Sequence, residues 1–354
     1  MWFKSISALL LIMAVLTFMP LIFSQKVKAE TLEPPMENIS PSTTAQGKKQ
    51  IVITAIGDCT LATDATFGYD STLPAVIDAN NGDLAYVFKG IHQVTSVDDL
   101  TIANLEGTFT TSSARYPKTF AFKGPPEYAK MLTLGSIEAV NLANNHTYDY
   151  YEAGFEDTIK ALDREGILWL GEGTAKVYKT KGFKIGLLGY AFTIDETQLA
   201  KEISALKDIT DIVVVSFHWG EEGSYWPNSE QNILARLSID SGADIVIGHH
   251  PHVLQGIEIY KNRLIAYSLG NFAFGGNMNP QDKRTMLLQV KFTTNEKGVQ
   301  MPDAKIVPAR ISSATWINDY QPTILEGEDR QTFLEWFQPL CSGVQLQNGE
   351  IKIF

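Results

Sequence analysis

Short apolar runs that end in polar residues recur along the chain and predict most of its strands. Their β-branched content and period-two alternation are typical of buried β-strands. The predicted strands cover residues 51–58, 100–107, 139–143, 167–170, 184–190, 212–218, 244–247 and 286–293. Residues 257–260 and 264–268 flank a polar Lys-Asn-Arg turn and predict a β-hairpin. After residue 295 the pattern weakens into short β segments.

Helical periodicity lies between several of these strands. Phe155, Ile159 and Leu162 follow an i, i+4, i+7 spacing, which predicts a helix over 151–164 that Gly166 closes. The other predicted helices cover residues 85–94, 127–134, 229–241 and 330–337, and the predicted loops cover 60–81 and 171–183. Strands alternate with helices up to about residue 250, and hairpins dominate afterwards. This order favours an α/β fold with layers of mixed sheet and helices outside.

The N-terminal segment, residues 1–29, resembles an export signal. Residues 6–23 are uncharged and almost wholly apolar, which is long for a signal peptide and just long enough to span a bilayer. Val27-Lys28-Ala29 offers a small-residue cleavage site, so a cleaved signal peptide and an uncleaved signal-anchor both remain open. Either one predicts that the rest of the chain lies on the extracytoplasmic face of the cell membrane, or is secreted if cleavage occurs.

The remaining chain divides by composition. Residues 30–50 are rich in Pro, Ser, Thr and Glu and predict a flexible stalk. We expect residues 51–294 to form the main domain and residues 295–354 to form a β-rich extension packed on it. The two cysteines, Cys59 and Cys341, are too few for a disulfide framework.

The net charge of the chain limits the classes of partner that we expect. The formal net charge is −11, which argues against nucleic acid because such a partner needs a basic patch. The same charge would repel a polyanionic substrate, so local positive charge, such as metal ions, would have to attract it. At 44% hydrophobic and 19% charged residues, the composition is that of an ordinary globular domain.

Five predicted strands end in residues suited to metal binding. They are Asp58, Glu106, Asn145 with His146, His218, and His250 with His252. Each alone has an ordinary explanation, such as a cap, a turn or a core histidine, but in layered α/β proteins the carboxyl ends of strands are where ligands bind. Together with His249, which directly precedes His250, these positions hold five of the six histidines.

This donor set predicts a centre of two divalent ions. A carboxylate at Glu106 can bridge two cations about 3.5–4 Å apart. Mixed nitrogen and oxygen donors favour Mn, Fe or Zn over Ca or Mg. An imidazole that binds no metal, for which His146 is the best candidate, can protonate a leaving group.

Six motifs between about Ile51 and Phe274 resemble the CapA family of poly-γ-glutamate capsule biosynthesis proteins. In chain order they are Gly57-Asp58, Asn104-Leu105-Glu106-Gly107, Asn141-Leu142-Ala143-Asn144-Asn145-His146 with Asp149, Phe217-His218-Trp219-Gly220, Gly248-His249-His250-Pro251-His252-Val253 and Ser268-Leu269-Gly270-Asn271-Phe272. The resemblance implies a branch of the calcineurin-like metallophosphoesterases, with a four-layer α/β/β/α sandwich and a two-metal centre.

The resemblance also implies roles for single residues. The metal ligands would be Asp58, Glu106, Asn145, His218, His250 and His252, with Asp58 and His146 catalytic. Supporting or substrate-binding roles would fall to Asn104, Asp149 and Asn271, and also to His249, which has no counterpart in that superfamily. One position departs from the pattern, because Thr60 stands where the superfamily has the histidine of an Asp-x-His motif. One metal shell is therefore a ligand short, or is completed by water or another residue.

Three functions follow as hypotheses. The first is a membrane-anchored, metal-dependent protein of capsule polymer synthesis or export, beside membrane poly-γ-glutamate synthase subunits and acting on an anionic polymer or a phosphorylated substrate. The second is a non-catalytic accessory subunit that grips the polymer or the synthase. The third is a hydrolase of γ-glutamyl amide bonds. Arg115 and Lys123 follow the Glu106 motif and would steer an anionic substrate, unless they are ordinary surface charges.

Overall fold

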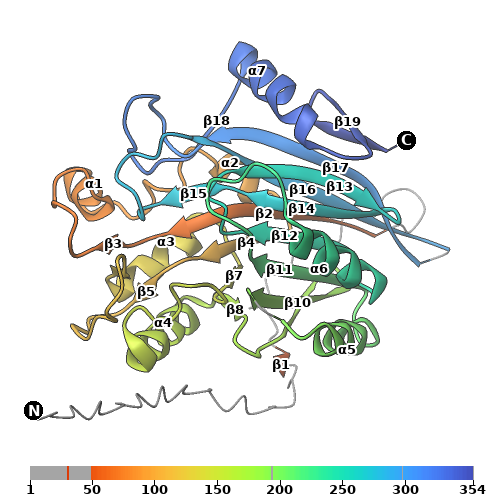
Figure 1. Ribbon diagram of the computed structural model, residues 1–354, viewed down its shortest axis with the longest axis horizontal. Helices are drawn as coiled ribbons and strands as arrows, with labels where there is room; N and C mark the ends of the chain where they lie inside the picture. Colours follow the sequence, from red (N-terminus) through yellow and green to blue (C-terminus); the bar gives the residue numbers. More distant parts are fainter. Residues whose placement is uncertain (1–29, 32–48, 193, 297, 354) are drawn as a thin grey trace, which may run out of the picture.

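The computed structural model describes residues 30–31, 49–192, 194–296 and 298–353, which form two large sheets, a small sheet and flanking helices (Figure 1). The seven-stranded sheet has the order β1-β9-β10-β11-β12-β14-β13. Its strands are β1 (Glu30–Thr31), β9 (Lys176–Thr180), β10 (Phe183–Ala191), β11 (Ile212–His218), β12 (Ile245–His249), β13 (Leu254–Tyr260) and β14 (Arg263–Leu269). Parallel and antiparallel pairs both occur in it.

The ten-stranded sheet has the path β19-β20-β17-β16-β2-β4-β7-β8, with β15 beside β2 and β18 beside β17. Its strands are β2 (Gln50–Thr60), β4 (Leu100–Leu105), β7 (Ala139–Asn141), β8 (Leu168–Leu170), β15 (Asn271–Phe274), β16 (Arg284–Asn295), β17 (Gly298–Arg310), β18 (Thr323–Ile324), β19 (Val344–Gln347) and β20 (Glu350–Ile353). The small sheet joins β3 (Thr63–Asp64), β6 (Phe122–Gly124) and β5 (Thr108–Phe109). The expected mixed α/β architecture is therefore confirmed.

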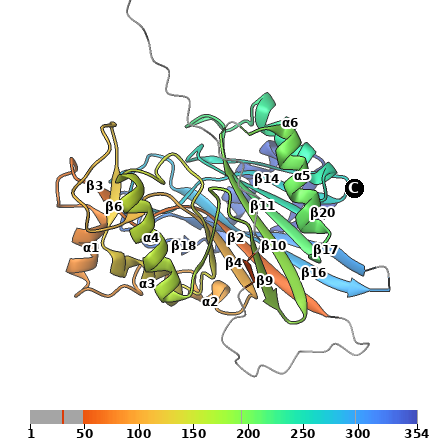
Figure 2. The same cartoon turned by 90° about the horizontal axis from the view of Figure 1, so that it is seen from below.

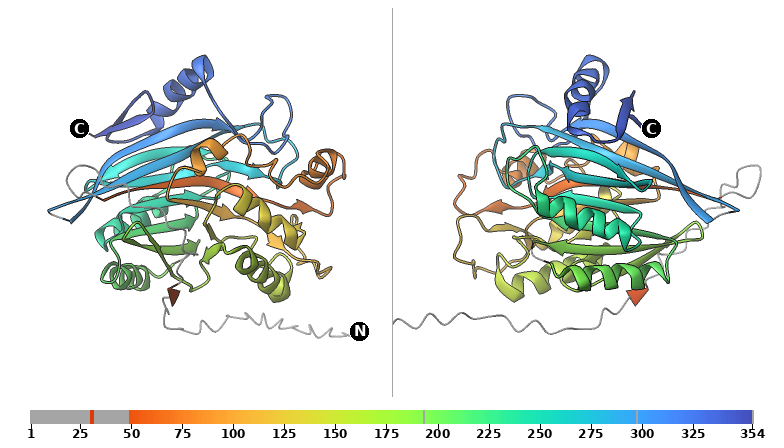
Figure 3. Two further views of the ribbon diagram at one scale, coloured as in Figure 1. Left: turned by 180° about the vertical axis from the view of Figure 1, so that it is seen from behind. Right: turned by 45° about the vertical axis from the view of Figure 1, so that its right-hand side comes forward.

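The helices lie in two groups and one C-terminal element. Their bounds are α1 (Leu73–Ala79), α2 (His92–Thr95), α3 (Ala129–Leu134), α4 (Tyr151–Glu165), α5 (Glu196–Lys207), α6 (Ser229–Asp240) and α7 (Gly327–Phe337), with short 3-10 turns at Pro126–Tyr128 and Gln338–Leu340. Figure 2 shows α3 and α4 together and well apart from α5 and α6. Figure 3 shows α7 above the long strand β17, against which it packs.

Buried apolar side chains form three clusters that follow this arrangement. One cluster draws on both large sheets, with Ile53 and Ile102 from one and Val214 and Ile247 from the other. A second joins the ten-stranded sheet to α1, α3 and α4. The third joins the seven-stranded sheet to α5 and α6. The two large sheets thus share one core, and each also has a core of its own with helices.

Most predicted elements are present, and the exceptions have local causes. The predicted loop 60–81 contains α1, which is too short to show a helical period, and the predicted turn 171–183 contains β9. The helix expected over 85–94 is mostly turns, with only α2 helical. The short β segments expected after residue 295 include the 13-residue strand β17, which pairs with β16 along its length.

The N-terminal predictions are not tested by these elements. The export signal at residues 1–29 lies outside the described residues, as does most of the predicted stalk. Within the described part of the chain, no helix is long and apolar enough to cross a membrane. The division of the chain at residue 294 stays a prediction, although β16 and β17 pair across it.

Candidate metal centre

The strand ends that carry the predicted metal ligands meet between the two large sheets. β2 runs parallel to β4, and β11 runs parallel to β12, so the carboxyl ends of each pair lie side by side. A register shift in β2 between Ala55 and Asp58 gives a bulge, which re-aims the side chains that follow it. The Asp58 amide donates to the Gly270 carbonyl at 2.8 Å, an approach that needs glycine at position 57 because a Cβ there would lie 2.0 Å from that oxygen.

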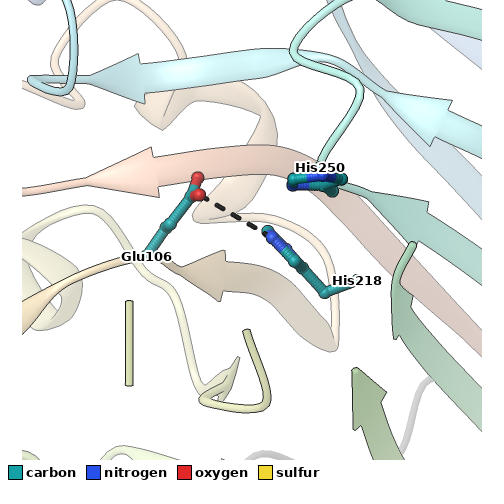
Figure 4. A group of neighbouring side chains, drawn as sticks. All are labelled: Glu106, His218 and His250. Carbon is teal, nitrogen blue, oxygen red and sulfur yellow. Dashed lines mark ion pairs between the residues drawn. The ribbon is translucent and has the colours of Figure 1, made fainter. Parts of the chain in front are cut away.

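Glu106, His218 and His250 offer ligand atoms that all lie within 4.8 Å of one another. Figure 4 shows the Glu106 carboxylate pointing toward the His218 imidazole with His250 beside them, and Glu106 Oε1 lies 3.7 Å from His218 Nε2. Asn145 Oδ1 lies 2.8 Å from the same His218 nitrogen and adds an oxygen donor. We call these four residues the His218 group.

A second set, the Asp58 group, consists of Asp58, Glu106 and His252, whose ligand atoms also lie within 4.8 Å of one another. His252 Nδ1 is 3.4 Å from Asp58 Oδ2, and His252 Nε2 is 3.9 Å from Glu106 Oε1. Glu106 belongs to both groups, so it occupies the position from which a carboxylate can bridge two ions.

The Glu106 carboxylate tests whether this donor set fits metal ions. The residue is fully buried, and neither of its oxygens has a hydrogen-bond partner within the described chain. Leaving a buried carboxylate unpaired is costly, so such groups in proteins usually have a cation or hydrogen-bond donors against them. Imidazoles and one amide complete the surroundings, and this mixture suits a divalent transition metal. The residues present therefore fit the implied metal centre.

Burial and neighbouring charges shift the pKa values of the cluster. Burial raises the pKa of Glu106 to about 8, although the charge of His252 opposes the shift. Burial would also raise the pKa of Asp58, but the imidazoles of His249 and His252 hold it well below the usual value. For His252, burial is outweighed by Glu106 and Asp58, which raise its pKa to about 9. Burial lowers the pKa of His218 and of His250. Without a metal ion, the cluster therefore holds protons that a cation would displace.

His146, the predicted acid, lies at the edge of the His218 group. Its Nδ1 is 2.7 Å from Asp149 Oδ2, and its Nε2 is 3.8 Å from Glu106 Oε1. Burial lowers the pKa of His146, while the Asp149 carboxylate acts in the opposite sense. Asp149 thus orients the ring so that Nε2 faces the cluster. Lys118 Nζ donates to Asp149 Oδ1 at 2.6 Å and to the Asn145 carbonyl at 2.8 Å. It therefore links the His146–Asp149 pair to Asn145, a candidate metal ligand.

Three predicted supporting residues hold the Asp58 group. Asn104 Nδ2 donates to Asp58 Oδ1 at 2.9 Å. Asn271 Oδ1 lies 3.0 Å from His252 Nδ1, and His249 Nδ1 lies 3.4 Å from Asp58 Oδ1. The predicted metal, acid and supporting residues therefore come together in space, and their roles remain predictions.

The histidine segment has an unusual backbone. His250 and His252 have φ values of 93° and 58°, in the left-handed region that side chains other than glycine rarely adopt. Such conformations cost free energy and cluster at functional sites. Here they turn the two ligand candidates on either side of Pro251 toward the same cluster.

Arg115 and Lys123, which were expected to steer an anionic substrate, contact other groups of the protein. Arg115 pairs with Asp64 at 2.9 Å, and Lys123 donates to the Ser112 carbonyl and lies over the Tyr150 ring. Sequence reasoning missed Lys118 and also Glu222, whose carboxylate lies within 4.8 Å of ligand atoms of His250 and His252. Both lie in loops without a strand-end pattern, although Glu222 follows His218 by only four residues.

Comparison with known proteins agrees with these motifs. A family model described as "Bacterial capsule synthesis protein PGA_cap" matches residues 52–276. The capsule biosynthesis protein CapA of Bacillus anthracis is 33% identical over 220 residues, 53% of this chain and 54% of that protein. The PGA biosynthesis protein CapA of Bacillus subtilis (strain 168) is 32% identical over 214 residues, 53% of this chain and 56% of its own. A probable polyglutamine synthesis accessory protein of Mycobacterium tuberculosis is 27% identical over 209 residues, 49% of this chain and 55% of that protein. The chain spans about half the length of the curated relatives it matches.

Proposed function

Because the chain belongs to the bacterial capsule synthesis family PGA_cap, we propose that it serves in the synthesis or export of poly-γ-glutamate or a related surface polymer. It would work at the extracytoplasmic face of the membrane, held by its N-terminal segment and beside membrane synthase subunits. The apolar run at residues 6–23 supports this location. The names of the two Bacillus relatives support the polymer.

The proposed fold is a four-layer α/β/β/α sandwich resembling the metallophosphoesterases. The three apolar clusters support it, because one lies between two sheets and the other two lie between a sheet and helices. Such layering would place the strand ends of both sheets around one centre, which is where the Asp58 and His218 groups lie.

The proposed chemistry is metal-dependent hydrolysis of a phosphoester. One observation carries it: the buried Glu106 carboxylate has no hydrogen-bond partner among the described residues and belongs to two ligand groups. Asp58, Glu106 and His252 would hold one ion, and Glu106, Asn145, His218 and His250 would hold the other. Two bound ions supply an acidified water and neutralise charge on a phosphoryl oxygen.

The side chains contribute orientation and proton transfer. Asp149 holds the His146 ring through Nδ1, so Nε2 faces the centre and, when the ring is protonated, gives its proton to the departing oxygen of the substrate. Asn104 and Asn271 fix Asp58 and His252, and this keeps the ligand geometry from relaxing when substrate enters. His146 is therefore the proposed general acid, and Asp58 is a ligand at the reacting centre.

The second candidate function is a non-catalytic subunit. It is favoured by Thr60, which stands where the resemblance implies a histidine ligand and whose buried hydroxyl has no hydrogen-bond partner in the described chain. The Mycobacterium relative is also named as an accessory protein. Hydrolysis of γ-glutamyl amide bonds by the same centre would remain a form of the catalytic proposal, with a different substrate.

Glu106→Gln separates these functions in cells that make the polymer and carry this chain as their sole copy. The variant keeps the shape of the side chain but removes the bridging charge. Catalysis predicts loss of polymer while the synthase complex still assembles, as measured by polymer immunoassay and co-purification. Unchanged polymer would contradict the catalytic proposal, and loss of both polymer and complex would favour the accessory subunit. Polymer of altered length would point to amide hydrolysis.

A further inference from the structure

The two ligand groups are unequal. The His218 group offers four donor residues, while the Asp58 group offers three. Thr60 occupies the position from which the resemblance implies a histidine, and its hydroxyl is buried without a partner in the described chain. An ion held by Asp58, Glu106 and His252 alone would have three protein ligands, one fewer than an ion in the His218 group.

Glu222 lies beside one histidine of each ligand group. Its carboxylate and ligand atoms of His250 and His252 all lie within 4.8 Å of one another. This spacing suits atoms that share one ion, since metal–oxygen and metal–nitrogen bonds of about 2.0–2.2 Å place neighbouring donors roughly 3–4 Å apart. No hydrogen bond or ion pair occupies the Glu222 carboxylate within the part of the chain that the structure describes.

The backbone fixes Glu222 beside the histidine segment. The amide of Gly223 donates to the Pro251 carbonyl at 2.8 Å, so the residue after Glu222 is bonded to the residue between His250 and His252. A second hydrogen bond holds the loop that contains Glu222, since Gln255 Nε2 donates to the Ser224 carbonyl at 2.9 Å. Its turn uses positive φ angles at glycine, 76° at Gly223. These hydrogen bonds restrain the backbone next to Glu222, although the Glu222 side chain is exposed.

We infer that Glu222 is a ligand of the metal ion in the Asp58 group and replaces the histidine that Thr60 displaces. This inference rests on the two-metal centre of the proposed function. A carboxylate in that place makes the shell of this ion richer in oxygen, with Asp58, Glu106 and Glu222 around one imidazole. Such a shell favours Mn²⁺ or Fe²⁺ over Zn²⁺ relative to a histidine-completed one. It also closes the centre from the solvent side, because Glu222 comes from a surface loop.

The test counts Mn²⁺ ions on the full-length chain after removal of bound metal. Free Mn²⁺ is followed by electron paramagnetic resonance during titration, and bound metal is checked by elemental analysis. Glu222→Gln is compared with Glu221→Gln, a neighbouring acid that belongs to none of the ligand groups. Both changes lie in a surface loop, and circular dichroism checks that each variant is folded.

We expect two Mn²⁺ ions per chain for the unaltered protein and for Glu221→Gln. In Glu222→Gln one ion should stay tight, and the affinity of the other should fall by at least roughly 10–100-fold, a loss that removal of an outer partner alone can produce. Equal binding by the two variants would overturn the role of Glu222 and leave the metal centre intact. No Mn²⁺, Fe²⁺ or Zn²⁺ on the unaltered chain would overturn the proposed centre and this inference with it.

Discussion

Glu106→Gln should change the stability of the chain with opposite signs in the absence and presence of metal. The carboxyl is fully buried, and its pKa is raised from 4.5 to about 8. Because the pKa of this carboxyl is higher in the folded chain than in the unfolded chain, folding is favoured most below pH 4.5, and this stability is lost as the pH rises toward 8. At pH 7, about 2.5 pH units above the ordinary pKa of 4.5, keeping the carboxyl protonated in the folded chain costs about 3 kcal/mol of stability, which the neutral amide removes.

The metal-free variant should therefore be more stable than the metal-free original by up to about 3 kcal/mol, or several degrees in Tm. With Mn²⁺ in excess the order should reverse, because ions that bind the folded chain stabilise it in proportion to the logarithm of their affinity. The assay is thermal unfolding of both proteins at pH 7, with chelator and with saturating Mn²⁺.

Glu138→Gln is the matched control. Glu138 is mostly buried with a pKa also raised to about 8, but it precedes β7, at the opposite end of that strand from Asn145 and His146. Its substitution should shift Tm by the same amount with and without metal. The reasoning is refuted if Glu106→Gln lowers the Tm of the metal-free chain, or if Mn²⁺ raises the Tm of both Glu106→Gln and the original equally.

Three further predictions concern protons, orientation and packing. Mn²⁺ affinity should rise as the pH rises from 6 to 9, because His252 with a pKa of about 9 and Glu106 with a pKa of about 8 must lose protons to bind; calorimetry in buffers of different ionisation enthalpy should show proton release, and its absence at pH 7 would contradict the assignment. Lys118→Met should raise the pKa of His146, since the ammonium lies 3.2 Å from its Nδ1 and disfavours the charged ring; an unchanged or lower value in an NMR titration would disprove this contact. Gly57→Ala should destabilise the chain by several kcal/mol, because its Cβ would lie 2.0 Å from the Gly270 carbonyl oxygen and 2.8 Å from that of Leu269; urea unfolding measures this, and a loss below about 1 kcal/mol would show that β2 can move away.

The sequence located the cluster because parallel strands bring their carboxyl ends together. Asp58, Glu106, His218 and His250 each follow a β-branched run, and that pattern predicts that each lies at the carboxyl end of a strand. It does not show that the first two belong to one sheet and the last two to the other. The orientation of Arg115 could not be read in this way, because its partner Asp64 lies 51 residues earlier in a strand of only two residues. Local pattern carries no information on such long-range pairs.

Loops account for most of what sequence reasoning missed. Glu222 reaches the cluster only because Gly223 is bonded to Pro251, a contact between two turns that no periodicity encodes. Lys118 lies likewise in a loop. Strand β17 was missed as a single long strand because it pairs with β16, and partner strands supply hydrogen bonds that compensate for a weak apolar pattern.

The most direct test of the two-metal centre is anomalous diffraction from crystals of the protein grown with Mn²⁺ and measured at the manganese edge. The account predicts two anomalous peaks about 3.5–4 Å apart, one on each side of the Glu106 carboxylate. One would lie among Asp58, His252 and Glu222, and the other among Asn145, His218 and His250. A fully occupied Mn²⁺ elsewhere on the chain, with no peak next to Glu106, would contradict it.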